Sequence, residues 1–194
     1  MNENEMTVYL VRHCQAESQD AEAPLTKEGV KQSDRLAVFF ADKKINAIYS
    51  SPFKRAIQSV EQVALDKKLP IIQDFRLQER RLSGKPIDDW KEKLAASFDD
   101  PLLTLDGGES SKEAAKRGWE ALEESVEKRE GAVMLVTHGN LLALLLRKID
   151  ERFGFAEWEQ LSNPDVFKLT LSSGIATSVQ RVWQADANKA PHLT

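Results

Sequence analysis

The segment AVMLVTH, at residues 132–138, limits the possible folds of this chain more than any other segment. Its apolar residues follow one another without polar alternation, which is typical of a strand that is buried on both faces. Such a strand needs helices on both faces of its sheet. The apolar run GNLLALLLRKI at 139–149 follows directly and predicts one of those helices. The two segments together predict a layered α/β fold.

Other predicted strands and helices alternate along the chain. Thr26 is typical of an N-cap and predicts a helix that reaches about Lys44, with Val30 facing the core. Ser51 followed by Pro52 predicts the start of the next helix. Further predicted helices cover about 88–98 and 110–130, and the predicted strands cover 7–11, 45–50, 70–74, 132–138, 166–172 and 175–183.

This alternation predicts a three-layer α/β/α sandwich with a mostly parallel central sheet. We expect a single domain over residues 1–194, because no repeat or linker divides the sequence. The irregular stretch at about 75–108 is expected to form an insertion on the substrate side of the domain. The residues from about 186 are expected to form a tail.

The charge balance and the single cysteine exclude several classes of protein. Lys and Arg number 27 and Asp and Glu 31, which gives a formal net charge of −4. That balance argues against a nucleic-acid partner and against a membrane partner, because both rely on a basic excess. The aliphatic run at 141–146 is too short to cross a bilayer, and the polar N-terminus resembles no signal peptide. Because Cys14 is the only cysteine, no intrachain disulfide forms, and we expect a cytoplasmic protein.

Polar residues that could take part in catalysis or ligand binding follow three of the predicted strands. Arg12 and His13 follow the first strand, and His138 ends the strand at 132–138. Arg55 lies one turn into the helix after the second strand. Ligands of open α/β sheets bind beyond the carboxyl ends of the strands. We therefore expect these four side chains to meet at one edge of the sheet.

Two histidines, two arginines and a carboxylate suit phosphoryl transfer without a metal. A neutral histidine can act as a nucleophile, and its unperturbed pKa of about 6.5 leaves it largely neutral at cellular pH. Arginines bind phosphate through bidentate hydrogen bonds and stabilise the charge that spreads over a transferring phosphoryl group. The carboxyl group of Glu79, in a basic loop, could supply a proton to the leaving group.

The sequence resembles the histidine phosphatase superfamily, the phosphoglycerate mutase-like proteins. The signature of that family is similar to VRHCQAES at 11–18. The resemblance covers about residues 6–172 and continues, in the order of the family, through LTKEGVKQ at 25–32, YSSPFKRAIQSVE at 49–61, LQERRLSG at 77–84, DGGES at 106–110 and VTHGN at 136–140.

The resemblance implies a role for each matching residue. His13 would be the phosphorylated nucleophile, and Glu79 would be the general acid and then the general base for water. Arg12 and Arg55 would grip the phosphoryl oxygens. His138 would donate a further hydrogen bond to the phosphoryl group, and the backbone amide of Gly139 would complete the phosphate pocket. The family typically needs neither a metal nor a cofactor.

Other positions allow two interpretations. Gln19 is a candidate for substrate binding, at a position where related mutases often have asparagine. Arg80 and Arg81 could bind a second anionic group or be ordinary surface charges, and a surface ion pair with one of them is the alternative role for Glu79. Cys14 stands where the family usually has glycine, and it could be a redox switch or a tolerated small residue.

These features favour a phosphomonoesterase that acts on a small phosphorylated metabolite. The interval between Glu79 and Gly107 is shorter than is usual in phosphoglycerate mutases, which should leave a phosphoenzyme open to water. A cofactor-dependent phosphoglycerate mutase is the first alternative. A non-catalytic phospho-ligand binder is the second. The physiological substrate and the oligomeric state stay open.

Overall fold

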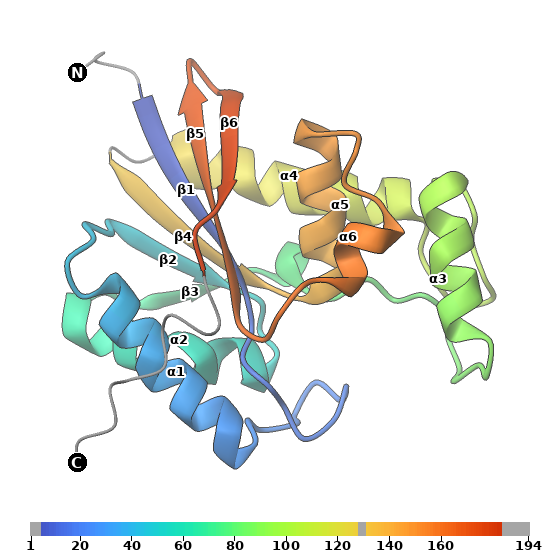
Figure 1. Ribbon diagram of the computed structural model, residues 1–194, viewed down its shortest axis with the longest axis horizontal. Coiled ribbons are helices and arrows are strands. Elements are labelled where there is room, and N and C mark those ends of the chain that lie inside the picture. The colour runs from blue at the N-terminus through green and yellow to red at the C-terminus, as the bar shows by residue number, and fades with distance from the viewer. Residues whose placement is uncertain (1–4, 128–130, 184–194) are drawn as a thin grey trace.

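Six strands form one sheet at the centre of the molecule, in the order β3-β2-β4-β1-β5-β6 (Figure 1). The computed structural model describes residues 5–127 and 131–183. Neighbouring strands pair in parallel from β3 to β1, whereas β5 runs antiparallel to both β1 and β6. The strands are β1 (Glu5–Arg12), β2 (Ala47–Ser50), β3 (Ile71–Gln73), β4 (Ala132–Thr137), β5 (Asp165–Ser172) and β6 (Ile175–Arg181).

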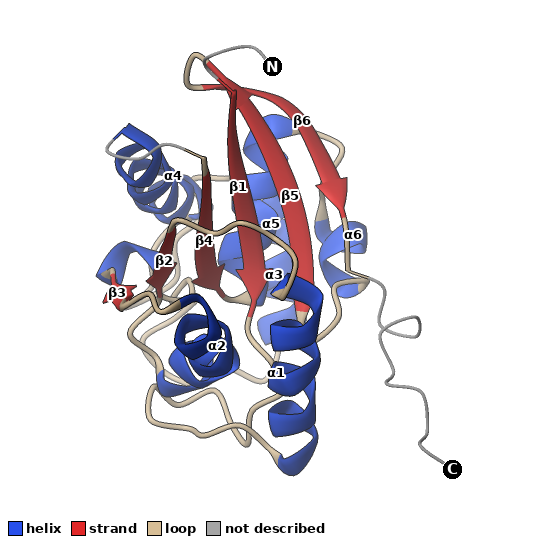
Figure 2. Ribbon diagram, turned by 90° about the vertical axis from the view of Figure 1, so that its left-hand side faces the viewer, coloured by secondary structure: helices blue, strands red, loops and turns tan. Residues whose placement is uncertain are grey.

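Helices cover both faces of this sheet, as Figure 2 shows. Two pack on one face, α1 (Lys27–Phe40) and α2 (Lys54–Lys67). The other face carries α4 (Ser111–Glu127) and α5 (Gly139–Ile149). Two shorter helices, α6 (Phe155–Glu159) and α3 (Trp90–Asp99), extend this layer because α6 packs on α5 and α3 packs on α6. The predicted three-layer sandwich is confirmed.

The side chains of β4 explain why the sheet needs two helical layers. Val133 and Leu135 belong to the core under α4 and α5, whereas Met134 and Val136 belong to the core under α1 and α2. All four side chains are fully buried. Successive side chains of a strand point to opposite faces, so an unbroken apolar strand places hydrophobic surface on both. The predicted burial of the segment at 132–138 on both faces is therefore correct.

Helix α1 differs from its prediction in length and in its buried face. It ends at Phe40 rather than near Lys44. Val30 is 51% exposed rather than inward-facing. The helix is rotated so that Gly29 faces the loop after β1, where a Cβ atom would lie 2.0 Å from the carbonyl oxygen of Gln15. This close approach of backbone to backbone sets the orientation of α1, and Val30 then turns towards solvent.

Other elements also differ from the predictions. The helix predicted from Ser51-Pro52 begins at Lys54, with Phe53 as its N-cap residue. The strand predicted at 45–50 is confined to β2. Helix α6 was not predicted. The end of the helix predicted to residue 130 and the tail from about 186 lie outside the described residues.

The insertion at about 75–108 is closed by a contact between its two ends. A short 3-10 helix, η1 (Phe75–Leu77), begins it. The amide of Gly84 donates to the carbonyl of Asp106 at 2.7 Å, and Gly107 adopts φ +67° within van der Waals reach of Gly84. Because any side chain at Gly107 would be strained, this turn depends on glycine. The loop that carries Glu79 therefore has a fixed path.

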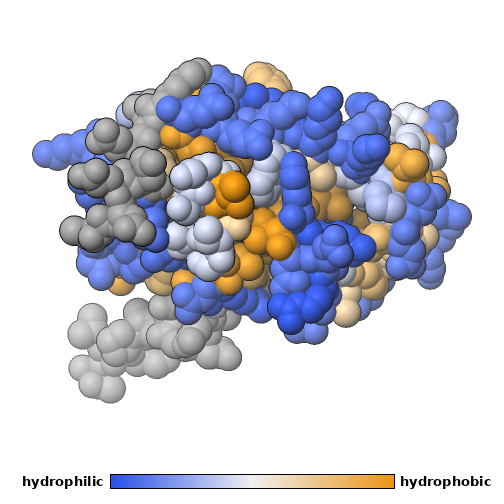
Figure 3. Space-filling model, turned by 90° about the horizontal axis from the view of Figure 1, so that it is seen from above, coloured by the Kyte–Doolittle hydropathy of each residue, from blue (hydrophilic) through white to orange (hydrophobic). Residues whose placement is uncertain are grey.

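In the view from above, hydrophilic side chains cover much of the face and apolar residues show between them (Figure 3). Among the residues that the structure describes, no helix is both long and apolar enough to span a membrane.

Candidate active site

Three parallel strands end side by side and bring the candidate residues together. Arg12 pairs with Thr137 in the register of β1 and β4, and Ser50 pairs with Val136 in that of β2 and β4. The pairing continues one residue further, because the amide of His13 donates to the carbonyl of Thr137 at 3.0 Å. The residues that follow the three strands therefore lie at the same edge of the sheet.

The imidazole of His13 is held in one orientation. The side chain is 6% exposed, and Nδ1 lies 2.6 Å from the carbonyl oxygen of Cys14. A carbonyl only accepts, so Nδ1 carries the hydrogen and Nε2 keeps a lone pair. Nε of Arg55 donates to that Nε2 at 3.3 Å. Burial, strengthened by the charges of Arg55 and Arg12, lowers the pKa of His13 to about 3 against the pull of the Cys14 carbonyl. The imidazole is thus neutral, with the lone pair of Nε2 turned towards Arg55.

His138 lies next to His13. The two rings are 5.0 Å apart between centroids, at an angle of 62°. Nε2 of His138 is 2.7 Å from Oγ of Ser51, and Nδ1 has no partner among the described residues. Full burial lowers the pKa of His138 well below its ordinary value, and the neighbouring His13 and Arg55 lower it further.

The two arginines approach the histidines from different elements. Arg55, on α2, is 1% exposed, and its Nη1 donates to the carbonyls of Gln19 and Asp20 at 3.0 and 2.7 Å. Arg12 donates from Nη1 to the carbonyl of Leu161 at 2.9 Å. Burial lowers the pKa of both guanidinium groups, and the charge of Glu79 opposes this effect. These backbone contacts hold two cations beside the two imidazoles.

Gly139 leaves space for the guanidinium of Arg12. A Cβ atom at position 139 would lie 3.1 Å from Nε, Cζ and Nη2 of Arg12. Gly139 is also the first residue of α5, and the helix dipole favours a negative charge at this end. The close packing of arginine on glycine therefore places a cation beside a helix N-terminus.

Glu79 is bound to the same helix terminus. Its Oε2 accepts from the amide of Asn140 at 3.0 Å, and its Oε1 accepts from the amides of Leu141 and Arg80 at 3.0 and 2.9 Å. Glu79 forms no ion pair with Arg80 or Arg81 in the described part of the chain, so the alternative interpretation as a surface ion pair is wrong. The carboxylate is instead held close enough to Arg12 and Arg55 to affect their pKa.

Arg117 on α4 supports the Glu79 loop, and the sequence analysis missed it. Its Nη1 donates to the carbonyls of Arg76 and Gln78 at 2.6 and 2.9 Å. Its Nε and Nη2 bind the two carboxylate oxygens of Glu109 at 3.0 and 2.6 Å. Burial opposes ionisation of Glu109, but Arg117 lowers the pKa of that carboxyl below its usual value. No sequence pattern marks a side chain that binds carbonyls far away in the chain.

The residues proposed to contact the rest of the substrate differ in their surroundings. A cleft of about 800 Å³ beside Arg55 and Glu79 is lined by Gln19, Arg80 and Arg81. Arg81 and Gln19 are exposed there. The guanidinium of Arg80 is buried, where it donates to Oγ of Ser97 at 2.6 Å and to the carbonyl of Glu109 at 3.1 Å. Arg80 therefore has a structural role whether or not it also meets a ligand.

Cys14, the residue after His13, lies in the core. It is fully buried, and its amide donates to Oγ of Ser59 at 2.8 Å. Burial raises the pKa of the thiol to about 12, despite the favourable contact with Ser59. A reactive thiol needs a depressed pKa and access to solvent. The interpretation as a tolerated small residue fits these surroundings better than the redox switch.

No group of three or more His, Cys, Asp or Glu side chains that could hold a metal occurs in the described ranges. The site described above consists instead of two imidazoles, two guanidinium groups, one carboxylate and the N-terminus of α5.

Comparison with known sequences gives a family match over most of the chain. The histidine phosphatase superfamily (branch 1) model matches residues 8–181, which confirms the resemblance in the sequence. Fructose-2,6-bisphosphatase TIGAR of Bos taurus is 28% identical over 110 residues, which are 53% of this chain and 41% of that protein. The probable phosphoglycerate mutase GpmB of Yersinia pestis is 28% identical over 159 residues, 73% of each chain.

Solved structures have the same fold. YhfR of Bacillus stearothermophilus superposes with a TM-score of 0.74 at 26% identity, over 88% of this chain and 94% of that one. A mycobacterial glucosyl-3-phosphoglycerate phosphatase gives a TM-score of 0.73 at 21% identity, over 92% of this chain and 97% of the other.

Proposed function

This chain belongs to the histidine phosphatase superfamily, and on that basis we propose that it hydrolyses a small phosphorylated metabolite through a phosphohistidine intermediate. The observation that carries the proposal is the state of His13. Its Nδ1 is bound to the carbonyl of Cys14, and its Nε2 faces the guanidinium of Arg55. A phosphoryl group that reaches Nε2 would meet a neutral nucleophile and a fixed cation together.

In the proposed first step, Nε2 of His13 attacks phosphorus and the bond to the leaving oxygen breaks. Arg12, Arg55, His138 and the amide of Gly139 hold the phosphoryl oxygens, and the carboxylic acid form of Glu79 gives its proton to the leaving oxygen. The buried cations support this role because they offer preorganised positive charge. The products are the free alcohol and a phosphorylated His13.

In the second step, the carboxylate of Glu79 takes a proton from water, which attacks the phosphohistidine. The nitrogen–phosphorus bond breaks, phosphate leaves, and Glu79 is again protonated. The contacts of Glu79 with the amides of Asn140 and Leu141 support this cycle, because they hold one carboxyl group beside the nucleophile for both steps.

The adjoining cleft suits a small substrate that carries, besides its phosphate, either a second anionic group or an apolar ring. Arg81 and Lys85 contribute exposed cations, and Phe53, Phe75 and Trp90 contribute aromatic surface. Gln19 and Arg81 are proposed as substrate contacts at its rim. The single cysteine supports a reducing compartment such as the cytoplasm.

The decisive experiment combines turnover with trapping of the intermediate. We expect the protein to release phosphate from an aryl phosphate in the presence of EDTA, and His13→Ala to release none. Acid-free quenching and peptide mass spectrometry should find one phosphoryl group on His13. Full activity of His13→Ala would contradict the proposal. Tight phosphate binding without turnover or a trapped species on any substrate would instead favour the non-catalytic binder.

A phosphoglycerate mutase is the second candidate, and its support is the similarity to the probable mutase GpmB. The mutase reaction returns the phosphoryl group to a hydroxyl group of phosphoglycerate rather than to water. We expect 3-phosphoglycerate with a trace of 2,3-bisphosphoglycerate to yield more free phosphate than 2-phosphoglycerate. The reverse ratio would favour the mutase.

A further inference from the structure

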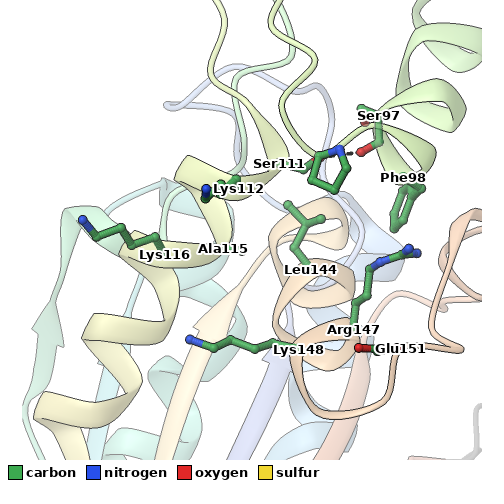
Figure 4. Close-up of a pocket in the computed structure, with 11 residues that line it drawn as sticks. Ser97, Phe98, Ser111, Lys112, Ala115, Lys116, Leu144, Arg147, Lys148 and Glu151 are labelled. Atoms are coloured by element: carbon green, nitrogen blue, oxygen red, sulfur yellow. Dashed lines mark hydrogen bonds between the residues drawn. The ribbon is translucent and has the colours of Figure 1, made fainter.

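A second cleft lies between α3, α4 and the C-terminal half of α5. Its volume is about 720 Å³, and it shares no lining residue with the cleft beside Glu79. Figure 4 shows Leu144 in its middle, with Phe98 on one side and Ala115 on the other. Pro101 adds an exposed apolar ring. The floor of this second cleft is therefore apolar.

Positive charges surround that floor. Lys112 and Lys116 come from α4, and Arg147 and Lys148 come from α5, as Figure 4 shows. Glu151 is the single carboxylate of the lining. The whole chain carries a net charge of −4, so this excess of cations is a local departure from the average. Such a concentration of one charge sign attracts an anion of the opposite sign.

The protein itself neutralises little of this charge. Within the described ranges, Lys112 and Arg147 form no ion pair with a carboxylate. Lys116 is 3.9 Å from Glu120, and both side chains are exposed, so that pair is weak. The ammonium of Lys148 lies 4.5 Å above the ring of Trp119, and Nη1 of Arg147 donates to the carbonyl of Phe153 at 3.5 Å. Among the described residues, no close and buried carboxylate neutralises these four cations.

We propose that this second cleft binds a nucleotide or a similar organic polyphosphate with a planar apolar group. The lysines and Arg147 would bind the phosphates, and the apolar floor around Leu144 would accept the base. An inorganic anion would leave the floor exposed, and an uncharged ring would leave the cations unpaired. The volume is within the range of pockets that hold ligands of this size.

The second cleft contacts the loop of the catalytic site through one residue. Ser97 lines the cleft, and its hydroxyl accepts from Nη1 of Arg80 at 2.6 Å. The amide of Arg80 in turn donates to Glu79. Ser111, also in the lining, donates to the carbonyl of Ser97 at 2.9 Å. A ligand in the second cleft would therefore contact Ser97, which holds the side chain of Arg80 in the Glu79 loop.

Calorimetric titration with a non-hydrolysable nucleoside triphosphate analogue tests this proposal. The pocket variant is Lys112→Ala with Lys148→Ala, one lysine from each helix. The matched control is Lys31→Ala with Lys44→Ala, which removes two exposed lysines elsewhere. We expect the pocket variant to raise the dissociation constant by about tenfold or more and the control by less than about twofold. Ala115→Glu, which puts a carboxylate on the floor, should weaken binding similarly.

Two further measurements distinguish binding at this site from binding at the catalytic site and from binding of any anion. Arg55→Ala should leave the affinity unchanged, because Arg55 lies in the other cleft. Tripolyphosphate, which lacks the apolar group, should bind at least about tenfold more weakly than the analogue. Equal effects of the pocket and control variants, loss of binding in Arg55→Ala, or equal affinity for tripolyphosphate would each overturn the proposal.

Discussion

Nδ1 of His13 and the carbonyl oxygen of Cys14 lie 2.6 Å apart, and this contact determines which nitrogen of the imidazole can react. With the hydrogen on Nδ1, the lone pair of Nε2 faces the guanidinium of Arg55. The side chain at position 14 is not involved, because the contact is made by its backbone. This explains how the chain can carry cysteine at position 14 without losing the orientation of the His13 imidazole.

The Cys14 thiol is expected to be inert in the folded protein. Burial raises its pKa to about 12, so the thiolate that would react is scarce. A thiol reagent such as dithionitrobenzoate should modify the native protein far more slowly than the protein in urea, and Cys14→Ala should keep most of the activity. Rapid loss of activity in mild peroxide, absent from Cys14→Ala, would restore the redox interpretation.

Glu79→Gln should separate the two chemical steps. An aryl phosphate has a leaving group that needs no proton, so the first step should survive, whereas activation of water should slow by about 10²–10⁴-fold. Stopped-flow measurement should then record a burst of about one nitrophenolate per site, followed by slow turnover. An alkyl phosphate should give no burst.

The control for that experiment is Glu120→Gln, which removes an exposed carboxylate on α4. It should behave like the wild-type protein with both substrates. A Glu79→Gln variant that is equally slow with both substrates and shows no burst would argue that Glu79 only supports the structure.

Gly139→Ala should weaken phosphate binding. The added methyl group would lie 3.1 Å from three atoms of the Arg12 guanidinium, which the carbonyls of Leu161 and Ser162 hold in place. We expect kcat/KM to fall by about tenfold and the inhibition constant of inorganic phosphate to rise. Gly154→Ala is the matched control, since the nearest atom to its Cβ would be 3.5 Å away. Equal kinetics of the two variants would refute the proposed fit of Arg12 against Gly139.

Arg117→Met should loosen the Glu79 loop. Loss of the charged hydrogen bonds to Glu109 and to the carbonyls of Arg76 and Gln78 should destabilise the fold by about 1.5–3 kcal/mol. Since the loop carries the proposed proton donor, kcat for an alkyl phosphate should fall more than the burst rate for an aryl phosphate. Arg117→Lys should recover only part of the lost stability and part of the lost activity, because lysine cannot form a bidentate pair with a carboxylate. A drop in the unfolding temperature with unchanged kinetics would leave Arg117 a purely structural role.

Acidification should destabilise the protein through its buried histidines. The pKa of His13 is about 3 in the folded state and about 6.5 when unfolded, so the unfolded chain binds the proton more readily between these values. The contribution of the neutral imidazole to the free energy of unfolding is fully present above pH 6.5 and is lost as the pH falls towards 3. Urea unfolding between pH 4 and 6 should have a smaller pH slope in His13→Asn, by up to about 1.4 kcal/mol per pH unit. Identical slopes would contradict the low pKa.

The arrangement of the strands and the position of the site follow from local patterns in the sequence. The unbroken apolar strand at 132–138 required two helical layers, and parallel strand ends then placed His13 and His138 at one edge. Side chains that depend on contacts between distant segments could not be predicted in this way. Arg117 binds carbonyls of η1 and its following loop across the fold, and Val30 is exposed because Gly29 packs on Gln15. Periodicity within one helix carries no information about either contact.

The central place of β1 in the sheet has a consequence for how this protein fluctuates. β1 is hydrogen-bonded to β4 on one side and to β5 on the other, and Val8 and Leu10 are fully buried. Segments of this kind open to solvent only when the whole domain unfolds, whereas loops and edge strands open locally. Amide hydrogens leading up to His13 should therefore exchange with the bulk at the slowest rate in the molecule. The cooperative unit that leads into His13 is therefore expected to unfold last.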